Sequence, residues 1–303
     1  MRDFYGFTKR NLLIYFKDVQ AIIFSLLTSI IVFALYLLFL KGTFVDAIDS
    51  AMMGLENIIN PDDVEMLVSG ILLVGIIGSA MITVPYTCLQ TIVRDRETKT
   101  SDDICATPMK RWKIILSYFT ASVISSFIVT GIIFTVGITV ISFMGDLHMS
   151  ALSLLSCYGI LMLGAVSSTA LFMLIVINFK RVSASSAFFG ILSSVAGFVI
   201  GAYIPLSQFS DGIQTICYLF PASHIAVLFR NSILNGILDS MNSSIGGLDN
   251  GLFVSAVKDS FSFGASFMGK TISLSNTIIY VGAFAFFCIA AMIIVYSRSY
   301  KRK

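Results

Sequence analysis

The sequence predicts an all-α integral membrane protein with six transmembrane helices, and three observations lead to this fold class. Hydrophobic residues make up 56% of the 303 residues and charged residues only 12%, against about 25% charged in a typical soluble domain. Six long apolar runs contain no Asp, Glu, Lys or Arg, and most basic residues lie between alternate runs or at the chain ends. A soluble fold cannot cover so much apolar surface, so this composition requires a bilayer as solvent.

The apolar runs define the predicted spans, because a helix needs about 20 apolar residues to cross the hydrocarbon core. The runs are residues 21–40, 67–89, 114–144, 153–177, 183–203 and 277–297. A further apolar stretch, 213–229, is interrupted by Pro221 and His224. It fits a re-entrant external hairpin better than a seventh span, provided that protein covers its backbone.

The basic residues predict which side of the membrane each loop faces. Sixteen of the twenty Lys and Arg residues lie before the first run, after the second, after the fourth and after the last. The other four are Lys41, Arg230, Lys258 and Lys270. Since cytoplasmic loops carry the excess of Lys and Arg, both chain ends are predicted to be cytoplasmic. A seventh span would move the basic C-terminus to the outside.

The first twenty residues predict an interfacial helix that anchors the first span. Apolar side chains recur at helical spacing, whereas Asp3, Arg10 and Lys17 share the opposite face; the apolar set is Phe4, Phe7, Leu12, Tyr15, Phe16 and Val19. A plain basic flank is the alternative interpretation.

The segment 92–113 predicts a small charged helix beneath the membrane. Ser101 is a plausible N-cap, with Asp102 and Asp103 in the first turn, where the helix dipole favours acidic residues. Pro108 ends the helix, and Trp112 sits beside Arg111 at the membrane edge. Such a helix would serve as the binding contact for a cytosolic partner. On physical grounds alone, an ordinary solvated loop explains the charged segment equally well.

Two stretches resemble the ABC type-2 permeases, the membrane subunits of a class of exporters. The first is the charged run 94–97 followed by Ala-Thr-Pro-Met-Lys-Arg-Trp at 106–112, which is similar to the coupling-helix region of that family. The second is Tyr-Ile-Pro-Leu at 203–206 followed by Tyr-Leu-Phe-Pro at 218–221, which resembles its external elements. His224 and the segment 235–276, an enlarged external insertion, depart from the pattern.

The resemblance implies a single permease domain over residues 1–303. It comprises an interfacial helix (1–20), five spans (21–203), an external hairpin and insertion (204–276), and a sixth span with a cytoplasmic tail (277–303). The chain would pair with a second permease subunit, as a homodimer or heterodimer, in the inner (plasma) membrane among its lipids. It would bind two copies of a cytosolic ATPase, which holds the ATP and Mg; the chain itself would bind no cofactor, metal or nucleic acid and would not be an enzyme.

The resemblance also implies roles for particular residues. The ATPase-coupling residues would be Arg94, Arg96, Glu97, Ser101, Asp102, Asp103, Ala106, Thr107, Pro108, Arg111 and Trp112. The external gate would contain Pro205, Tyr218, Phe220, Pro221 and His224.

One sequence motif and two other functions are alternatives to this hypothesis. Residues 264–271 fit the phosphate-loop pattern GxxxxGK[ST], but they lie in a predicted external segment with no room for the α/β domain that such a loop requires. A scaffold or sensor that binds a cytosolic partner without hydrolysis is the second hypothesis. A secondary transporter is the third, disfavoured because no span carries an ionisable residue.

Overall fold

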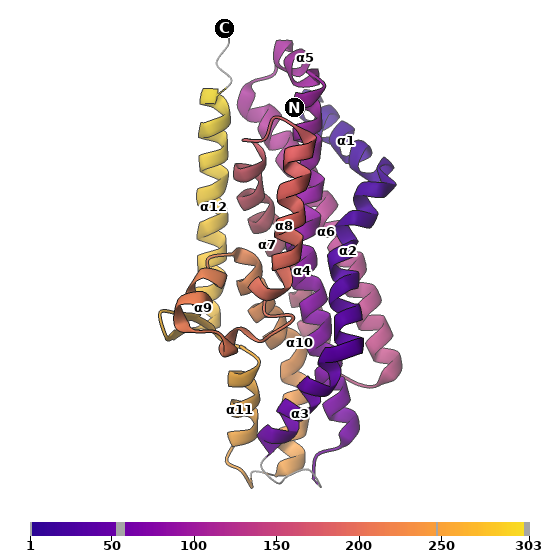
Figure 1. The fold of residues 1–303 in the computed structure, drawn as a ribbon, viewed down its shortest axis with the longest axis vertical. Helices are drawn as coiled ribbons and strands as arrows, with labels where there is room; N and C mark the ends of the chain where they lie inside the picture. The colour runs from indigo at the N-terminus through magenta and orange to yellow at the C-terminus, as the bar shows by residue number, and fades with distance from the viewer. Residues whose placement is uncertain (1, 53–57, 247, 300–303) are drawn as a thin grey trace.

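A computed structural model describes residues 2–52, 58–246 and 248–299, and the chain forms an elongated bundle of helices (Figure 1). The first elements are α1 (Arg2–Lys17), α2 (Val19–Leu35), the π-helical turn η1 (Tyr36–Leu40), α3 (Lys41–Met52), α4 (Pro61–Glu97), α5 (Thr100–Ala106), α6 (Arg111–Met144), α7 (Ala151–Val176) and α8 (Val182–Val199). The later elements are η2 (Leu206–Gln208), α9 (Asp211–Cys217), α10 (Pro221–Ile245), α11 (Leu252–Ser260), β1 (Ala265–Phe267), β2 (Lys270–Ile272) and α12 (Leu274–Ser299).

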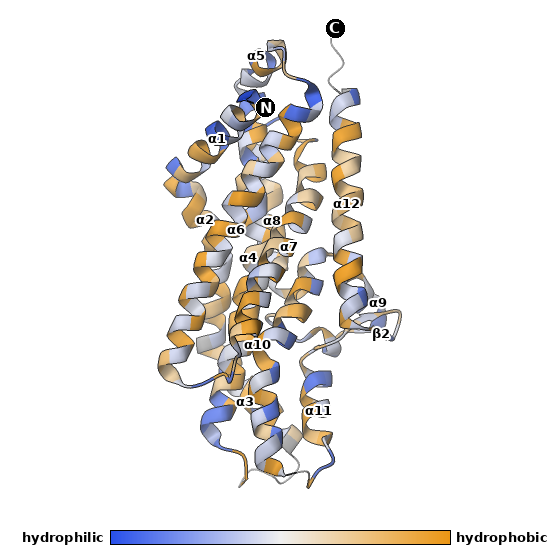
Figure 2. Cartoon of the chain, turned by 180° about the vertical axis from the view of Figure 1, so that it is seen from behind, coloured by the Kyte–Doolittle hydropathy of each residue, from blue (hydrophilic) through white to orange (hydrophobic). Residues whose placement is uncertain are grey.

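Six of the described helices are long and apolar enough to cross a membrane, with α2, η1 and α3 forming one continuous segment. Figure 2 shows the apolar residues along the middle of the bundle and hydrophilic ones at both ends. The start of α1, the end of α12 and α5 lie at the same end (Figure 1). In addition, α9 and α10 form a pair bent by 95°, which is either a re-entrant element or a broken seventh span.

The long helix α4 is the centre of the bundle. Asn60 caps it by accepting a hydrogen bond from the backbone N–H of Asp62 at 3.0 Å, and Pro61 occupies its first turn, as expected for a helix N-terminus. It packs against α2, α6, α7, α8 and α10. The sequence predicted a span at 67–89 with loops on either side. In the structure the helix is longer, because the acidic residues before the apolar run and the basic residues after it form additional hydrogen-bonded turns.

The surface helix α1 packs against α6, where the rings of Phe7 and Tyr118 meet edge to face at 4.9 Å. Its buried residues are Thr8, Asn11 and Tyr15, whereas Tyr5 is 73% exposed. Of the apolar stripe predicted from the sequence, Tyr15 is buried and Phe4, Phe7 and Leu12 are partly buried, whereas Phe16 and Val19 are exposed. Polar residues of α1 face the bundle because that end of the bundle carries charged groups.

The end of the molecule remote from α5 is built from α3, α11 and the far half of α10 (Figure 1). The predicted insertion 235–276 does not begin with a new element, because Asn235 lies inside α10. Beyond α10, Phe261 packs on Phe44 of α3 with ring centroids 5.5 Å apart. Asp249, just before α11, accepts hydrogen bonds from the N–H groups of Phe253 and Gly251, and these bonds lower the pKa of its carboxyl.

The chain is not purely helical. Strands β1 and β2 form an antiparallel hairpin in which Phe267 pairs with Lys270. Met268 and Gly269 make the turn with φ of 50° and 75°. The phosphate-loop pattern at 264–271 is thus a β-hairpin, and the strand-to-helix turn that cradles a phosphate is not formed by these residues.

Candidate functional site

The last turn of α4 joins four other parts of the chain through four consecutive residues, Arg94, Asp95, Arg96 and Glu97, which we call the clasp. Asp95 is only 5% exposed. Its two carboxylate oxygens accept hydrogen bonds from Arg10 of α1 at 2.6 and 2.8 Å, and a third from the hydroxyl of Tyr118 of α6. A bidentate pair of this kind fixes geometry as well as charge. The hydrogen bond with Asp95 raises the pKa of the Arg10 guanidinium.

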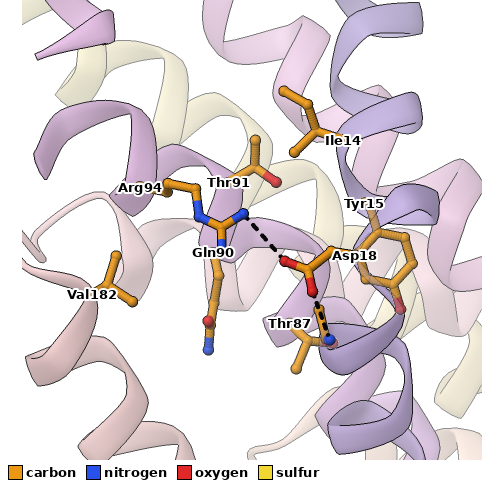
Figure 3. A pocket seen from close by; sticks show the side chains of 9 residues that line it. Ile14, Tyr15, Asp18, Thr87, Gln90, Thr91, Arg94 and Val182 are labelled. Atoms are coloured by element: carbon orange, nitrogen blue, oxygen red, sulfur yellow. Dashed lines mark hydrogen bonds and ion pairs between the residues drawn. The ribbon is translucent and has the colours of Figure 1, made fainter. Parts of the chain in front are cut away.

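Arg94 extends the clasp to the junction of α1 and α2. Its guanidinium lies 3.2 Å from Asp18 (Figure 3). Asp18 in turn accepts a hydrogen bond from the backbone N–H of Ala21 at 3.0 Å and so caps α2. A cavity of about 30 Å³ lies beside this pair, lined in part by Thr87 and Gln90, and is large enough for a water molecule on the usual size criterion.

Arg96 and Glu97 hold the turn between α7 and α8. The Arg96 guanidinium donates to the carbonyls of Ile177 and Phe179, the second at 3.1 Å. A carboxylate oxygen of Glu97 accepts from the N–H of Val182 at 3.1 Å, at the start of α8. The end of α4 is thereby tied to α1, α2, α6 and the α7–α8 turn.

The resemblance assigned Arg94, Arg96 and Glu97 to an ATPase contact. In the structure these three residues have partners within the chain itself. The sequence reasoning missed Asp95, Arg10 and Tyr118 as members of the same cluster. The alternating charges of 94–97 were visible, but nothing in the sequence indicated that Arg10 approaches Asp95 across 85 positions.

Helix α5 projects beyond the clasp at the end of the bundle (Figure 1). Ile104 and Met109 pack against the core, whereas Asp102, Asp103, Ala106, Thr107 and Pro108 are exposed. Ser101 and Arg111 are partly buried, and Trp112 is 42% exposed. The short helix thus has an anchored side and an open side.

The residue before α5 corrects one prediction. Lys99, not Ser101, is the N-cap, with φ of 61° in the left-handed region and no side-chain cap hydrogen bond. The tight reversal from α4 into α5 requires this conformation, which moves the N-cap two residues earlier than predicted.

Replacing Lys99 with glycine should stabilise the protein. Glycine adopts a positive φ without the steric cost that a side chain incurs there, although it also gains entropy in the unfolded chain. We expect Lys99→Gly to raise the free energy of unfolding by about 0.5–1 kcal/mol, measured as a higher apparent Tm in detergent. Lys110→Gly, at a cap with an ordinary negative φ of −66°, serves as the matched control and should give no increase.

At the other end of α8, two of the predicted gate residues, Tyr218 and His224, pack together in a cluster around the start of α10. Pro205 precedes η2, Phe220 caps α10 and Pro221 begins it. The hydroxyl of Tyr218 donates to the carbonyl of Gly264 at 3.1 Å, and its own carbonyl lies 2.7 Å from Nε2 of His224. Because a carbonyl only accepts, the Nε2 of His224 carries the proton.

His224 is fully buried and packs on Tyr280 of α12, with ring centroids 4.5 Å apart. It therefore links the α9–α10 bend to the last span.

Arg230 belongs to this cluster, although the charge count from the sequence treated it as a loop residue. It is 3% exposed within α10. Its guanidinium donates to the carbonyl of Ser262 at 3.0 Å and to those of Ile200 and Gly201 at 2.9 and 3.3 Å. Arg230 thus fastens the end of α8 to the end of α11.

The comparisons with known proteins now place this architecture. A family model described as "ABC-2 family transporter protein" matches residues 46–297. A search of curated proteins finds no match. The matched range contains α4, α5 and every later span. Since it covers most of the chain, the protein belongs to the ABC-2 transporter family, as a multi-span membrane permease that is not itself catalytic.

Proposed function

We propose that the chain is the membrane subunit of an ATP-driven exporter and that α5 is its contact with a cytosolic ATPase. The observation that carries this proposal is the combination of an exposed α5 with the clasp behind it. A push on Asp102 or Asp103 is transmitted to α4, and through Asp95, Arg96 and Glu97 to helices on both sides. A rigid element that moves a bundle as a body is a recognised route for conformational coupling.

The distribution of basic residues supports an orientation of the protein in the membrane. The end that carries α1, α5 and the last turn of α12 also carries most of the basic residues, and the positive-inside rule supports a cytoplasmic location for it. The opposite end, with α3 and α11, then faces outward (Figure 1). The basic residues 301–303 of the predicted cytoplasmic tail lie outside the described residues.

A second permease subunit would complete the transporter, and α8 is the span that supports this part of the proposal. It is the least buried of the candidate spans. Ser183, Ala187, Gly190 and Ser194 are exposed along one face, and a Cβ atom at Gly190 would meet no neighbouring helix within 4 Å. Small residues let helices approach closely within a membrane, so this face suits a partner span.

Reversing the charge of α5 should separate the ATPase from the permease. We expect the double variant Asp102→Lys and Asp103→Lys, tagged and purified from native membranes in mild detergent, to lose a stoichiometric cytosolic protein that co-purifies with the wild type. The expected protein contains a phosphate loop of its own. Asp239→Lys, which changes an exposed acidic residue on α10 near the opposite end, is the control and should retain it.

Loss of the partner from both variants would point to misfolding, which gel filtration detects. Absence of any phosphate-loop protein from the wild-type preparation would contradict the proposal and favour a scaffold or a secondary transporter.

A further inference from the structure

An apolar groove of about 600 Å³ runs along α4 between α2 and α6. Its walls include Ile30 and Phe33 of α2 and Val136 and Val140 of α6, all of which are 45–57% exposed. Both walls pack against α4. Because these helices are membrane spans, the groove opens toward lipid and not toward water.

One end of the groove is polar, unlike the rest of it. Lys41, Tyr36 and Ser69 line this end, and Lys41 forms an ion pair with Glu65 of α4. The two charged side chains are 45% and 44% exposed, so each has room for a further partner. The end of the groove therefore offers one cation and one anion side by side.

The hydroxyl of Tyr36 is the second observation that points to a ligand. Tyr36 is 3% exposed, and its oxygen has no hydrogen-bond partner among the described residues. Ser69 and Glu65 lie near it without making a hydrogen bond of normal length. A buried hydroxyl without a partner costs free energy, so a ligand group at this position would satisfy it.

The groove is longer than the hydrocarbon layer of one leaflet. Along the helix, Leu26 and Lys41 are separated by about 22 Å at a rise of 1.5 Å per residue, and both line the groove. A leaflet contributes about 15 Å of a hydrocarbon core that is about 30 Å thick. An acyl chain that starts at Lys41 would thus run past the bilayer midplane along apolar side chains.

We propose that this groove binds one phospholipid with a zwitterionic headgroup. The phosphate pairs with Lys41, the headgroup ammonium with Glu65, and the Tyr36 hydroxyl donates to an ester carbonyl, while one acyl chain lies between α2 and α6. A purely anionic lipid fits less well because Glu65 repels a second negative charge. The proposed orientation would put the headgroup of this lipid in the outer leaflet, whereas the binding itself depends neither on that orientation nor on the ATPase.

Native mass spectrometry of the purified chain, with phosphatidylethanolamine or phosphatidylglycerol added to the detergent, tests the proposal. The wild type should bind phosphatidylethanolamine in preference. Glu65→Gln should reduce that preference about fivefold, as expected for a partly exposed charged contact, and Lys41→Gln should weaken binding of both lipids. Val136→Trp, which fills the groove, should abolish the bound lipid, whereas Ile279→Trp on the exposed face of α12 should retain it.

Three results would overturn the proposal. The first is equal retention of phosphatidylethanolamine by the wild type and Val136→Trp, and the second is no preference between the two lipids in the wild type. The third is a change from dimer to monomer in Val136→Trp, which the same spectra report and which would make the groove a contact between subunits. The purified sample contains no ATPase, so a negative result in this lipid-binding experiment is distinct from a failure of the proposed ATPase contact.

Discussion

Asp95→Ala should destabilise the protein by about 2–3 kcal/mol, more than any other single change in the clasp. The substitution removes two charge-assisted hydrogen bonds to Arg10 and leaves the hydroxyl of Tyr118 without its acceptor. Breaking a buried ion pair costs about 3–5 kcal/mol, and we expect less here because the Arg10 side chain is 34% exposed and regains water. The measurement is the apparent Tm in detergent, which should fall by several degrees.

The adjacent ion pair is the matched control for Asp95. Arg94 and Asp18 are 56% and 26% exposed, and an ion pair near the surface contributes about 0–1 kcal/mol. Arg94→Ala should therefore have a small effect. If Asp95→Ala were as mild as Arg94→Ala, the clasp would not join α1 and α6 to α4 in the way described.

Arg230→Met should destabilise the half of the molecule remote from α5 by about 3 kcal/mol or more. The change leaves the carbonyls of Ser262, Ile200 and Gly201 without their shared donor, and each buried polar group without a partner costs about 1–3 kcal/mol. The Tm should drop, and limited proteolysis should cut first between α11 and β1, where Ser262 is released.

Replacing Arg230 with lysine tests whether the positive charge or the planar geometry of the guanidinium stabilises the protein. Arg230→Lys keeps the positive charge but replaces the planar fork with one ammonium, which cannot replace all three hydrogen bonds with the same geometry. It should recover only part of the lost stability. Lys258→Met, which changes a partly exposed lysine on α11, should leave the Tm unchanged. A wild-type Tm in Arg230→Lys would show that charge alone suffices.

The apolar runs predicted all six spans, because a bilayer demands about twenty apolar residues regardless of tertiary context. Their ends were less predictable. Helix α4 continues to Glu97 because the clasp satisfies its charged last turn, and this depends on contacts with distant segments. Helix α8 ends at Val199, before the predicted 203, because Gly201 turns the chain with φ of 72°.

The site residues also divide into those that local sequence predicts and those that depend on contacts with distant segments. The exposed side of α5 followed from local signals, since Asp102 and Asp103 favour a first helical turn and Pro108 limits its end. The burial of Arg230 did not, because an arginine in a loop-like sequence normally lies at the surface. Only the meeting of α8, α10 and α11 supplies three carbonyls in one place.

The most direct test of the central claim, that α5 is the ATPase contact, uses a cysteine that the chain already carries there. Cys105 on α5 is partly exposed, whereas the other four cysteines, Cys88, Cys157, Cys217 and Cys288, are buried. The measurement is the rate at which a membrane-impermeant maleimide labels Cys105 in inside-out vesicles, with the ATPase stripped off and then restored, and with Cys105→Ser as the background. The account predicts rapid labelling of the stripped vesicles and marked slowing when the ATPase is restored. Equal labelling with and without the ATPase, or labelling only from the outside of intact cells, would contradict it.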